Sequence, residues 1–324
     1  MLRILGAFLG LVLLVTFFGI VCPLNQQQFL WPPAALQINF LTVATQTVIV
    51  SLGAIGMTVV IIAGGIDLSV GSVVALSMVV TAQVFNASGS TLLAVLAGLA
   101  TGAVCGLVNG ALITGLKIVP FIITLGMMGV ARGGAKLVAD NTMVNPTSEA
   151  WTGSWLKPLM ALRPSPSWLL VSPGVWILAV LAVVMALVLR STVFGRHVFA
   201  IGSNEATARL CGIGVGRLKV SIYTLGGLFS GLGGVMFFSR QAQGDPTAAP
   251  GLELDVIAAV VIGGGSLKGG EGSILGSIIG AFIMGVLRHG LVKINVSNPV
   301  QEMLIGVIII VAVVVDQLRH RKGE

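Results

Sequence analysis

The sequence predicts an all-α integral membrane protein with about ten transmembrane helices. Of its 324 residues, 56% are hydrophobic and only 9% are charged, whereas a soluble domain carries about a quarter charged residues. Apolar runs long enough to cross a bilayer as a helix recur along the chain, and they are too long and too uniform for the strands of a membrane barrel. The 44 glycines fit closely packed and interrupted membrane helices.

The first predicted helix begins close to the N-terminus. Arg3 is followed by an apolar run over residues 4–21 that is long enough to cross a bilayer, and no small-residue cleavage site follows it. We therefore expect a transmembrane helix and not a signal peptide. A polar stretch over residues 22–37, with Trp31 as an interface anchor, separates it from the second helix.

The other predicted helices follow the apolar runs in order. The second covers residues 40–63 and leads into a glycine-rich turn at 64–72, after which the third continues to residue 85. Lys117 marks the end of the fourth helix, and Pro120 opens the fifth. The expected spans after the third are 91–114, 120–139, 169–189, 220–239, the short 254–263, 273–291 and 300–315.

The distribution of Lys and Arg predicts which side of the membrane each loop faces. Ten spans leave both chain ends on one side, and placing them in the cytoplasm gives the inner side more basic residues. Residues 140–168, rich in Trp and Pro, then form an ordered periplasmic loop. The inner set is Arg3, Lys117, Arg190, Arg196, Arg209, Arg217, Lys219, Lys268, Arg319, Arg321 and Lys322, and the outer set is Arg132, Lys136, Lys157, Arg163, Arg240, Arg288 and Lys293.

The cytoplasmic segment 190–219 contains the signals of a short helix. Ser203 or Asn204 can cap its start, because a side-chain oxygen can accept the free N–H groups of the first turn. Glu205 lies at the positive end of the helix and can pair with Arg209 one turn later.

This short helix is expected to end at Gly212, a common type of helix stop. It has about two turns, with Ala206 and Leu210 on one face, and a helix this short needs a packing partner to be stable. From the residues alone, it is either a docking helix or part of an ordinary cytoplasmic loop.

Two segments 201 residues apart resemble each other. Each interrupts an apolar run with glycines and then restarts a helix, and the topology above gives both the same orientation. We therefore expect a parallel repeat with halves at about 40–139 and 220–317 within one transmembrane domain, 1–324. A chance match between glycine-rich helices is the alternative. The matched residues are Val60 and Ile61 with Val261 and Ile262, Gly64 with Gly265, and Gly71 and Ser72 with Gly272 and Ser273.

Four segments carry a family resemblance, in the same order along the chain. They are residues 64–72 (GGIDLSVGS), 120–126 (PFIITLG), 200–213 (AIGSNEATARLCGI) and 253–264 (ELDVIAAVVIGG). The text resembles the ribose-type monosaccharide permeases of bacterial ABC importers, proteins of the inner membrane, from about residue 44 to residue 315. The match is specific because it covers nearly the whole chain.

The resemblance implies an assembly and a coupling region. In that family two permease subunits form the pore, two ATP-binding subunits dock on the cytoplasmic loops, and a periplasmic sugar-binding protein delivers the substrate. ATP and Mg are then held by the partner ATPase, with no cofactor on this chain. The coupling loop maps onto Gly202, Ser203, Asn204, Glu205, Ala206, Ala208, Arg209, Leu210 and Gly212.

Several kinds of chemistry lack their residues in this sequence. There is no Gly-x-x-x-x-Gly-Lys-Ser/Thr phosphate loop, no His/Cys metal spacing and no Ser/His/Asp arrangement that we can place. Basic residues are not interleaved with aromatic ones, as they are in nucleic-acid binding surfaces. Cys22, Cys105 and Cys211 are scattered, and we expect them to be apolar packing residues. We expect a transport subunit that is not itself an enzyme.

The gate and pathway candidates lie at the glycine breaks and at polar positions inside spans. Asp67 either caps the third helix or acts in the gate, and Asp255 is expected to be a cap. The polar residues inside spans either bond to neighbouring helices or meet sugar hydroxyls. The candidates are Gly64, Gly65, Asp67, Ser69, Gln46, Asn109, Thr124, Gly263 and Gly264.

Other functions stay open at this point. A permease for nucleosides or branched-chain amino acids is an alternative within the same superfamily. An ion-coupled secondary transporter would need an ion site, for which only Asp67 offers an obvious carboxylate. A channel or structural membrane subunit would not need a capped helix at 204–210. The second permease subunit is either another copy of this chain or a relative.

Overall fold

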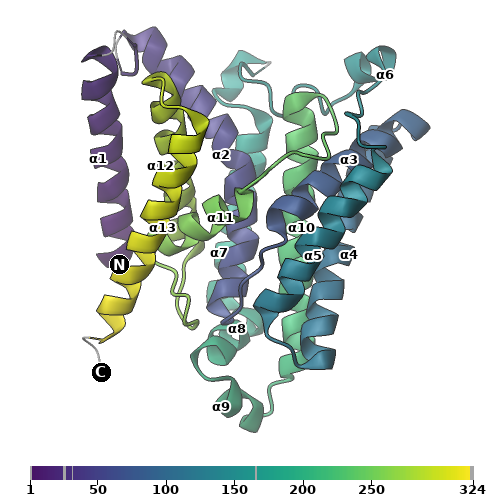
Figure 1. Cartoon of the computed structure of the whole chain (residues 1–324), viewed down its shortest axis with the longest axis vertical. Coiled ribbons are helices and arrows are strands. Elements are labelled where there is room, and N and C mark those ends of the chain that lie inside the picture. Colours follow the sequence, from purple (N-terminus) through teal and green to yellow (C-terminus); the bar gives the residue numbers. More distant parts are fainter. Residues whose placement is uncertain (1, 25–26, 31, 165, 322–324) are drawn as a thin grey trace.

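The computed structural model describes the chain except for residues 1, 25–26, 31, 165 and 322–324 (Figure 1). Within those described residues the fold is all-helical, and the only strand-like pairing is an isolated bridge between Val144 and Gly244. Eight described helices are long and apolar enough to cross a membrane. The predicted class is therefore confirmed, and the total of about ten spans stays a prediction.

The helices follow the apolar runs of the sequence closely. Their bounds are α1 Leu2–Leu24, α2 Pro33–Ile62, α3 Val70–Ser88, α4 Thr91–Leu116, α5 Pro120–Val138, α6 Ser148–Gly153, η1 Ser167–Leu169, α7 Pro173–Ser191, α8 Val193–Ser203, α9 Glu205–Leu210, α10 Val215–Gln241, α11 Leu252–Ile262, α12 Ile274–Lys293 and α13 Asn298–Arg321.

The α2 helix is longer than predicted, whereas α11 is about as short as predicted. The α2 helix begins at Pro33, not at residue 40, because Pro33 stands at a first-turn position, where its missing N–H costs nothing. The predicted span at 254–263 is the 11-residue helix α11. At 1.5 Å per residue it is about 16 Å long, roughly half of a bilayer core. In Figure 1 the segment that precedes α11 runs from one end of the molecule to its middle, where α11 begins.

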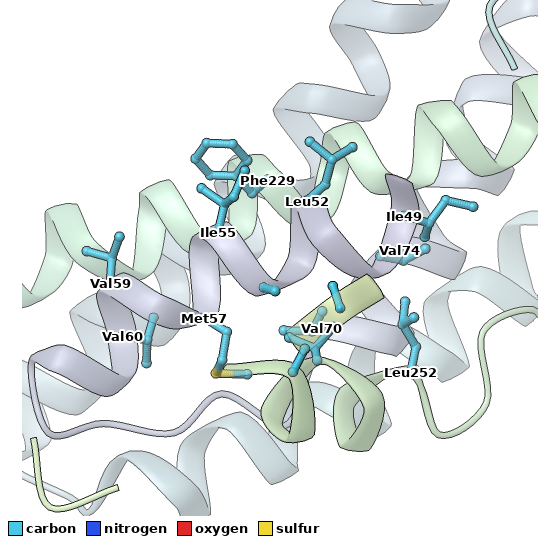
Figure 2. Close-up of a cluster of buried hydrophobic side chains, with 14 of the residues drawn as sticks. Ile49, Leu52, Ile55, Met57, Val59, Val60, Val70, Val74, Phe229 and Leu252 are labelled. Atoms are coloured by element: carbon cyan, nitrogen blue, oxygen red, sulfur yellow. The ribbon is translucent and has the colours of Figure 1, made fainter. Parts of the chain in front are cut away.

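The core is built around α2. In the most apolar stretch of α2, 89% of the residues are buried. In the corresponding stretches of α1, α4, α5 and α7, at most 22% of the residues are buried. Figure 2 shows side chains from α2, α3, α10 and α11 meeting in one cluster that includes Leu52, Ile55, Val70, Phe229 and Leu252. The helices with little burial carry much of the exposed apolar surface of the molecule.

Glycines set the close crossing of α4 and α10. A Cβ added at Gly102 would overlap the backbone at Gly227 and Gly231, and one at Gly106 would overlap the backbone of Tyr223. Small residues let membrane helices approach until their backbones touch. This crossing explains part of the high glycine content.

The segment over residues 140–172 folds back onto one end of the bundle. Trp151 packs on Phe85 and Phe238, with ring centroids 6.0 and 5.3 Å away, and Leu156 and Met160 are buried. At the opposite end lie α8 and α9. In Figure 1, α1 begins and α13 ends in the lower half of the view, the half that contains α8 and α9.

Candidate functional site

The first glycine break ends α2 with a Schellman motif. The N–H of Gly64 donates to the Ile61 oxygen at 2.9 Å, and the N–H of Gly65 donates to the Val60 oxygen at 3.0 Å. Gly64 has a φ of +79°, a left-handed conformation that glycine adopts without strain. A connection without regular secondary structure then leads to the start of α3.

The second break ends α11 with the same motif. The N–H of Gly264 donates to the Val261 oxygen at 2.9 Å, the N–H of Gly265 donates to the Val260 oxygen at 2.9 Å, and Gly264 has a φ of +93°. The two caps therefore match at a shift of 200 residues, one less than the predicted 201. The connection from α11 to α12 is four residues longer than that from α2 to α3, because α2 and α11 end 200 residues apart and α3 and α12 begin 204 apart.

The two breaks and the end of α8 meet at one junction. The N–H of Gly270, in the second connection, donates to the oxygen of Ile62 at the end of α2, at 2.8 Å. A Cβ at Gly202, near the end of α8, would overlap that same Ile62 oxygen and the Gly270 nitrogen. A movement of α8 at this point would therefore act on the end of α2 and on the connection that follows the second break.

Four of the predicted pathway residues converge beside the first break. The Asp67 carboxylate accepts from the backbone N–H and the hydroxyl of Ser69, at 2.8 and 2.6 Å. The Asn109 amide of α4 donates to the Ser69 hydroxyl at 3.1 Å, and the Thr124 hydroxyl of α5 is 3.3 Å from the Ile66 oxygen. We call Asp67, Ser69, Asn109 and Thr124 the break cluster.

Asp67 turns the chain into α3 without being its cap residue. The N-cap position of α3 is Ser69, and Asp67 bonds to the Ser69 N–H from two residues before it, as in an Asx turn. Asp67 is only 4% exposed, and its carboxyl group forms no ion pair with any residue in the described part of the chain. It is a buried acceptor beside an interrupted helix.

Sequence reasoning missed Tyr223, which lies against the first break. Its hydroxyl is buried without a hydrogen-bond partner, and a Cβ at Gly65 would overlap it. It is the only tyrosine of the chain and lies in an apolar span, and this unusual position could have identified it as a candidate from the sequence. A cavity of about 160 Å³, lined by Gly64, Gly65 and Tyr223, leads from there to Glu205 of α9.

Gln46 lies apart from the break cluster. It lines a separate cavity of about 350 Å³ with Thr42 and Thr45 of α2, Lys157 of the 140–172 segment and Arg240 near the end of α10. The Thr45 hydroxyl is buried there without a hydrogen-bond partner. The break cluster thus lies beyond the C-terminal end of α2, whereas Gln46 lies near the middle of that helix.

The predicted short helix is present as α9. Asn204, not Ser203, is its cap, and its side chain accepts from the Thr207 N–H at 2.9 Å. Glu205 pairs with Arg209 at 3.0 Å, as predicted, and also with Lys219 of α10 at 2.7 Å. The hydrogen bond from Lys219 is the main reason that the pKa of Glu205 lies below its ordinary value. These bonds tie α9 to α10.

One face of α9 is open. Leu210 is 88% exposed and Ala206 is also exposed, whereas Ala208 faces the core. Gly212 ends the segment with a φ of +83°. Cys211 is exposed, which corrects the expectation that all three cysteines pack inside; Cys22 and Cys105 are buried. An exposed leucine on a short, firmly tethered helix is suited to contact another protein.

Two arginines that the sequence reasoning did not single out, Arg132 and Arg288, hold α11 and the segment that precedes it. Asp255 pairs with Arg288 of α12 at 2.7 Å, while the N-cap of α11 is Gly251, so the expectation that Asp255 caps this helix is wrong. Arg132 of α5 donates to the oxygens of Pro246 and Ala248, at 3.2 and 2.7 Å. Neither partner could be identified from spacing, because both come from distant helices.

Comparisons with known proteins match the chain to permeases of transport systems. Residues 39–313 match the family described as branched-chain amino acid transport system / permease component. The chain is 39% identical over 287 residues to the Ribose import permease protein RbsC of Escherichia coli (strain K12), covering 87% of this chain and 86% of that protein. No solved structure matches the chain.

Two further relatives have similar coverage. The chain is 41% identical over 314 residues to the Ribose import permease protein RbsC of Bacillus subtilis (strain 168), covering 97% of this chain and 92% of that protein. It is 38% identical over 269 residues to the L-arabinose ABC transporter permease protein AraH of Azospirillum brasilense, covering 83% and 77%.

Proposed function

Because this chain belongs to the family described as the permease component of branched-chain amino acid transport systems, we propose that it is the membrane permease subunit of an ATP-driven importer. The substrate we propose is a monosaccharide. The observation that carries this proposal is the identity of about 40% to two ribose import permeases over most of both chains. The L-arabinose permease at 38% identity supports the same substrate class.

The proposed assembly follows from the two ends of the molecule. The end with α8 and α9 faces the cytoplasm, where the open face of Ala206 and Leu210 receives the ATP-binding subunit. ATP and Mg are held by that subunit. The opposite end, with residues 140–172, faces the periplasm and receives the sugar-binding protein. A second permease subunit completes the pore in the bacterial inner membrane.

The proposed mechanism couples docking to the glycine breaks. Movement of α9 reaches α10 through Glu205 and Lys219, and movement of α8 reaches both breaks through the contact of Gly202 with Ile62 and Gly270. A partner's ATP cycle then biases two conformations of the permease, because it binds one of them better than the other.

The break cluster supplies groups that suit sugar hydroxyls. The Asp67 carboxylate accepts hydrogen bonds, and the side chains of Asn109 and Tyr223 each have a buried polar atom without a partner. A buried polar atom without a partner costs free energy, and a passing hydroxyl can relieve that cost. We propose that these groups line the inner part of the path and that Gln46 lines its outer part.

The test is ATP hydrolysis by the reconstituted complex of permease, ATP-binding subunit and binding protein. We expect ribose or a related pentose or hexose to raise the hydrolysis rate several-fold when the binding protein is present. The family description makes leucine and isoleucine the alternative substrates. Stimulation by these amino acids, with none by any monosaccharide, would replace the sugar by the alternative.

A further inference from the structure

A basic cavity lies between α4, α9 and α10. Its volume is about 380 Å³. Three cationic side chains line it, each from a different element: Lys117 at the end of α4, Arg209 of α9 and Lys219 of α10. Thr114 adds a hydroxyl, and Glu205 is the only carboxylate among the lining residues.

The charges in this cavity do not balance. Glu205 is shared between Lys219 at 2.7 Å and Arg209 at 3.0 Å, so one negative charge faces two positive ones. Lys117 is exposed and forms no ion pair with any residue that the structure describes. The cavity therefore has an excess of positive charge that an anionic group can compensate, and a phosphate oxygen accepts hydrogen bonds from Lys and Arg.

Apolar surface continues from the cavity along the outside of α4. Leu116 is 59% exposed and Val119 is 62% exposed, on either side of Lys117. Only 22% of the most apolar stretch of α4 is buried, so one long face of this helix is exposed, opposite the face that packs on α10. A free anion would use the basic cavity alone, whereas a phospholipid also uses the apolar surface, with its chains on α4 and its headgroup among the cations.

We propose that this cavity binds the phosphate headgroup of an anionic membrane lipid. Basic pockets between membrane helices at the cytoplasmic face are where anionic headgroups bind. The bound phosphate bridges Lys117 of α4 to Arg209 of α9. The lipid thereby adds a second tether to the docking helix, beside the one from Glu205 to Lys219.

The test measures lipid binding directly and does not use transport. The full chain, purified in detergent, is titrated with phosphatidylglycerol and with phosphatidylcholine, and bound lipid is counted by native mass spectrometry. We expect wild-type protein to prefer phosphatidylglycerol. Lys117→Gln should bind it about fivefold more weakly, the effect of one cation near a membrane surface, and Lys117→Arg should restore binding. Lys136→Gln, an exposed lysine in the last turn of α5, is the matched control and should bind like the wild type.

Three outcomes would overturn the proposal. Equal phosphatidylglycerol binding by Lys117→Gln and wild type would remove the site. Displacement of the lipid by inorganic phosphate at equal concentration would show a site for a free anion. Loss of the lipid when the ATP-binding subunit is added would show that this subunit, and not a lipid, covers the cavity in the assembled complex. Because no outcome depends on sugar uptake, failure here leaves the proposed transport function untouched.

Discussion

The ion pair between Asp255 and Arg288 ties a half-length helix to a full span. Asp255 is 4% exposed, so its carboxylate depends on the arginine for compensation. The side chain of Arg288 is 38% exposed, so the arginine is less buried than its carboxylate partner. Removing one partner therefore costs more than removing both, because a buried charge is left alone.

We predict that Arg288→Met destabilises the protein by about 3 kcal/mol, the low end of the range for a broken buried pair. The double variant Asp255→Asn, Arg288→Met should recover most of that loss, because no unpaired carboxylate remains. Thermal unfolding of the purified proteins in detergent measures both. Equal destabilisation of the single and double variants would mean that the ion pair is not what holds α11.

Leu210 carries the second prediction at this scale. Because its side chain is 88% exposed, Leu210→Arg should leave folding and insertion unchanged. It places a charge on the open face of α9, so retention of the ATP-binding subunit and sugar uptake should fall together, by tenfold or more if about 1.4 kcal/mol of binding is lost.

Co-purification of the ATP-binding subunit from membranes measures that retention. The control is Leu170→Arg, the same change at a leucine that is 75% exposed, in the 140–172 segment at the opposite end of the molecule. It should retain the ATP-binding subunit. Normal retention and uptake in Leu210→Arg would show that α9 is not the docking helix.

At the scale of the elements, the glycines of the two caps have two different roles. Some adopt a left-handed backbone conformation, and others leave room for a neighbouring atom that a side chain would overlap. Gly64 has a positive φ, and an added Cβ would meet nothing within 4 Å. Gly65 and Gly263 are close-packing positions, because a Cβ would overlap the Tyr223 hydroxyl at the first and the Gly276 oxygen at the second. Substitutions at these positions therefore separate a hinge from a packing contact.

We expect Gly64→Val to abolish sugar uptake in protein that still folds and binds its ATP-binding subunit. The left-handed conformation costs a residue with a side chain about 1–2 kcal/mol, which a folded bundle can absorb but a balanced switch cannot. Gly64→Asn, which tolerates this conformation better, should keep more activity. Uptake and melting temperature are measured on the same preparations. If uptake falls only in proportion to the melting temperature in both variants, Gly64 has a packing role and is not a hinge.

The sequence predicted the elements well where local signals decide them. Apolar runs placed the long spans, Pro120 began α5 as predicted, and the spacing of Glu205 and Arg209 gave the pair seen in α9. It predicted the short span that is α11, but it missed the start of α2 at Pro33, and it placed the repeat one residue away from the shift of 200 at which the two caps match. Where several glycines follow one another, the sequence alone does not show which of them ends the helix.

At the scale of the whole molecule, the convergence of the break cluster could not be predicted. Asp67, Asn109 and Thr124 are single polar residues on separate elements, and only the packing of α3, α4 and α5 brings them together. The same holds for the junction of Gly202 with Ile62 and Gly270. Long-range contacts of this kind leave no periodic pattern in one sequence.

The proposed orientation predicts how a native cysteine reacts. Cys211 is exposed beside α9, whereas Cys22 and Cys105 are buried. A membrane-impermeant thiol reagent should leave the protein unlabelled in intact right-side-out preparations and label it in inside-out vesicles. Cys211→Ala should remove that label. Adding Met143→Cys, at an exposed position of the opposite end, should create labelling from the outside. The reverse pattern would invert the topology.

The most direct test of the central claim is accumulation of radiolabelled sugar in proteoliposomes. The permease and its ATP-binding subunit are reconstituted, the binding protein is supplied on the outside, and ATP is enclosed with Mg²⁺. We predict concentrative uptake of a monosaccharide such as ribose that needs both ATP and the binding protein and that is lost in Leu210→Arg. Uptake driven by an ion gradient without ATP, or ATP-driven uptake of leucine with no uptake of any monosaccharide, would contradict the account.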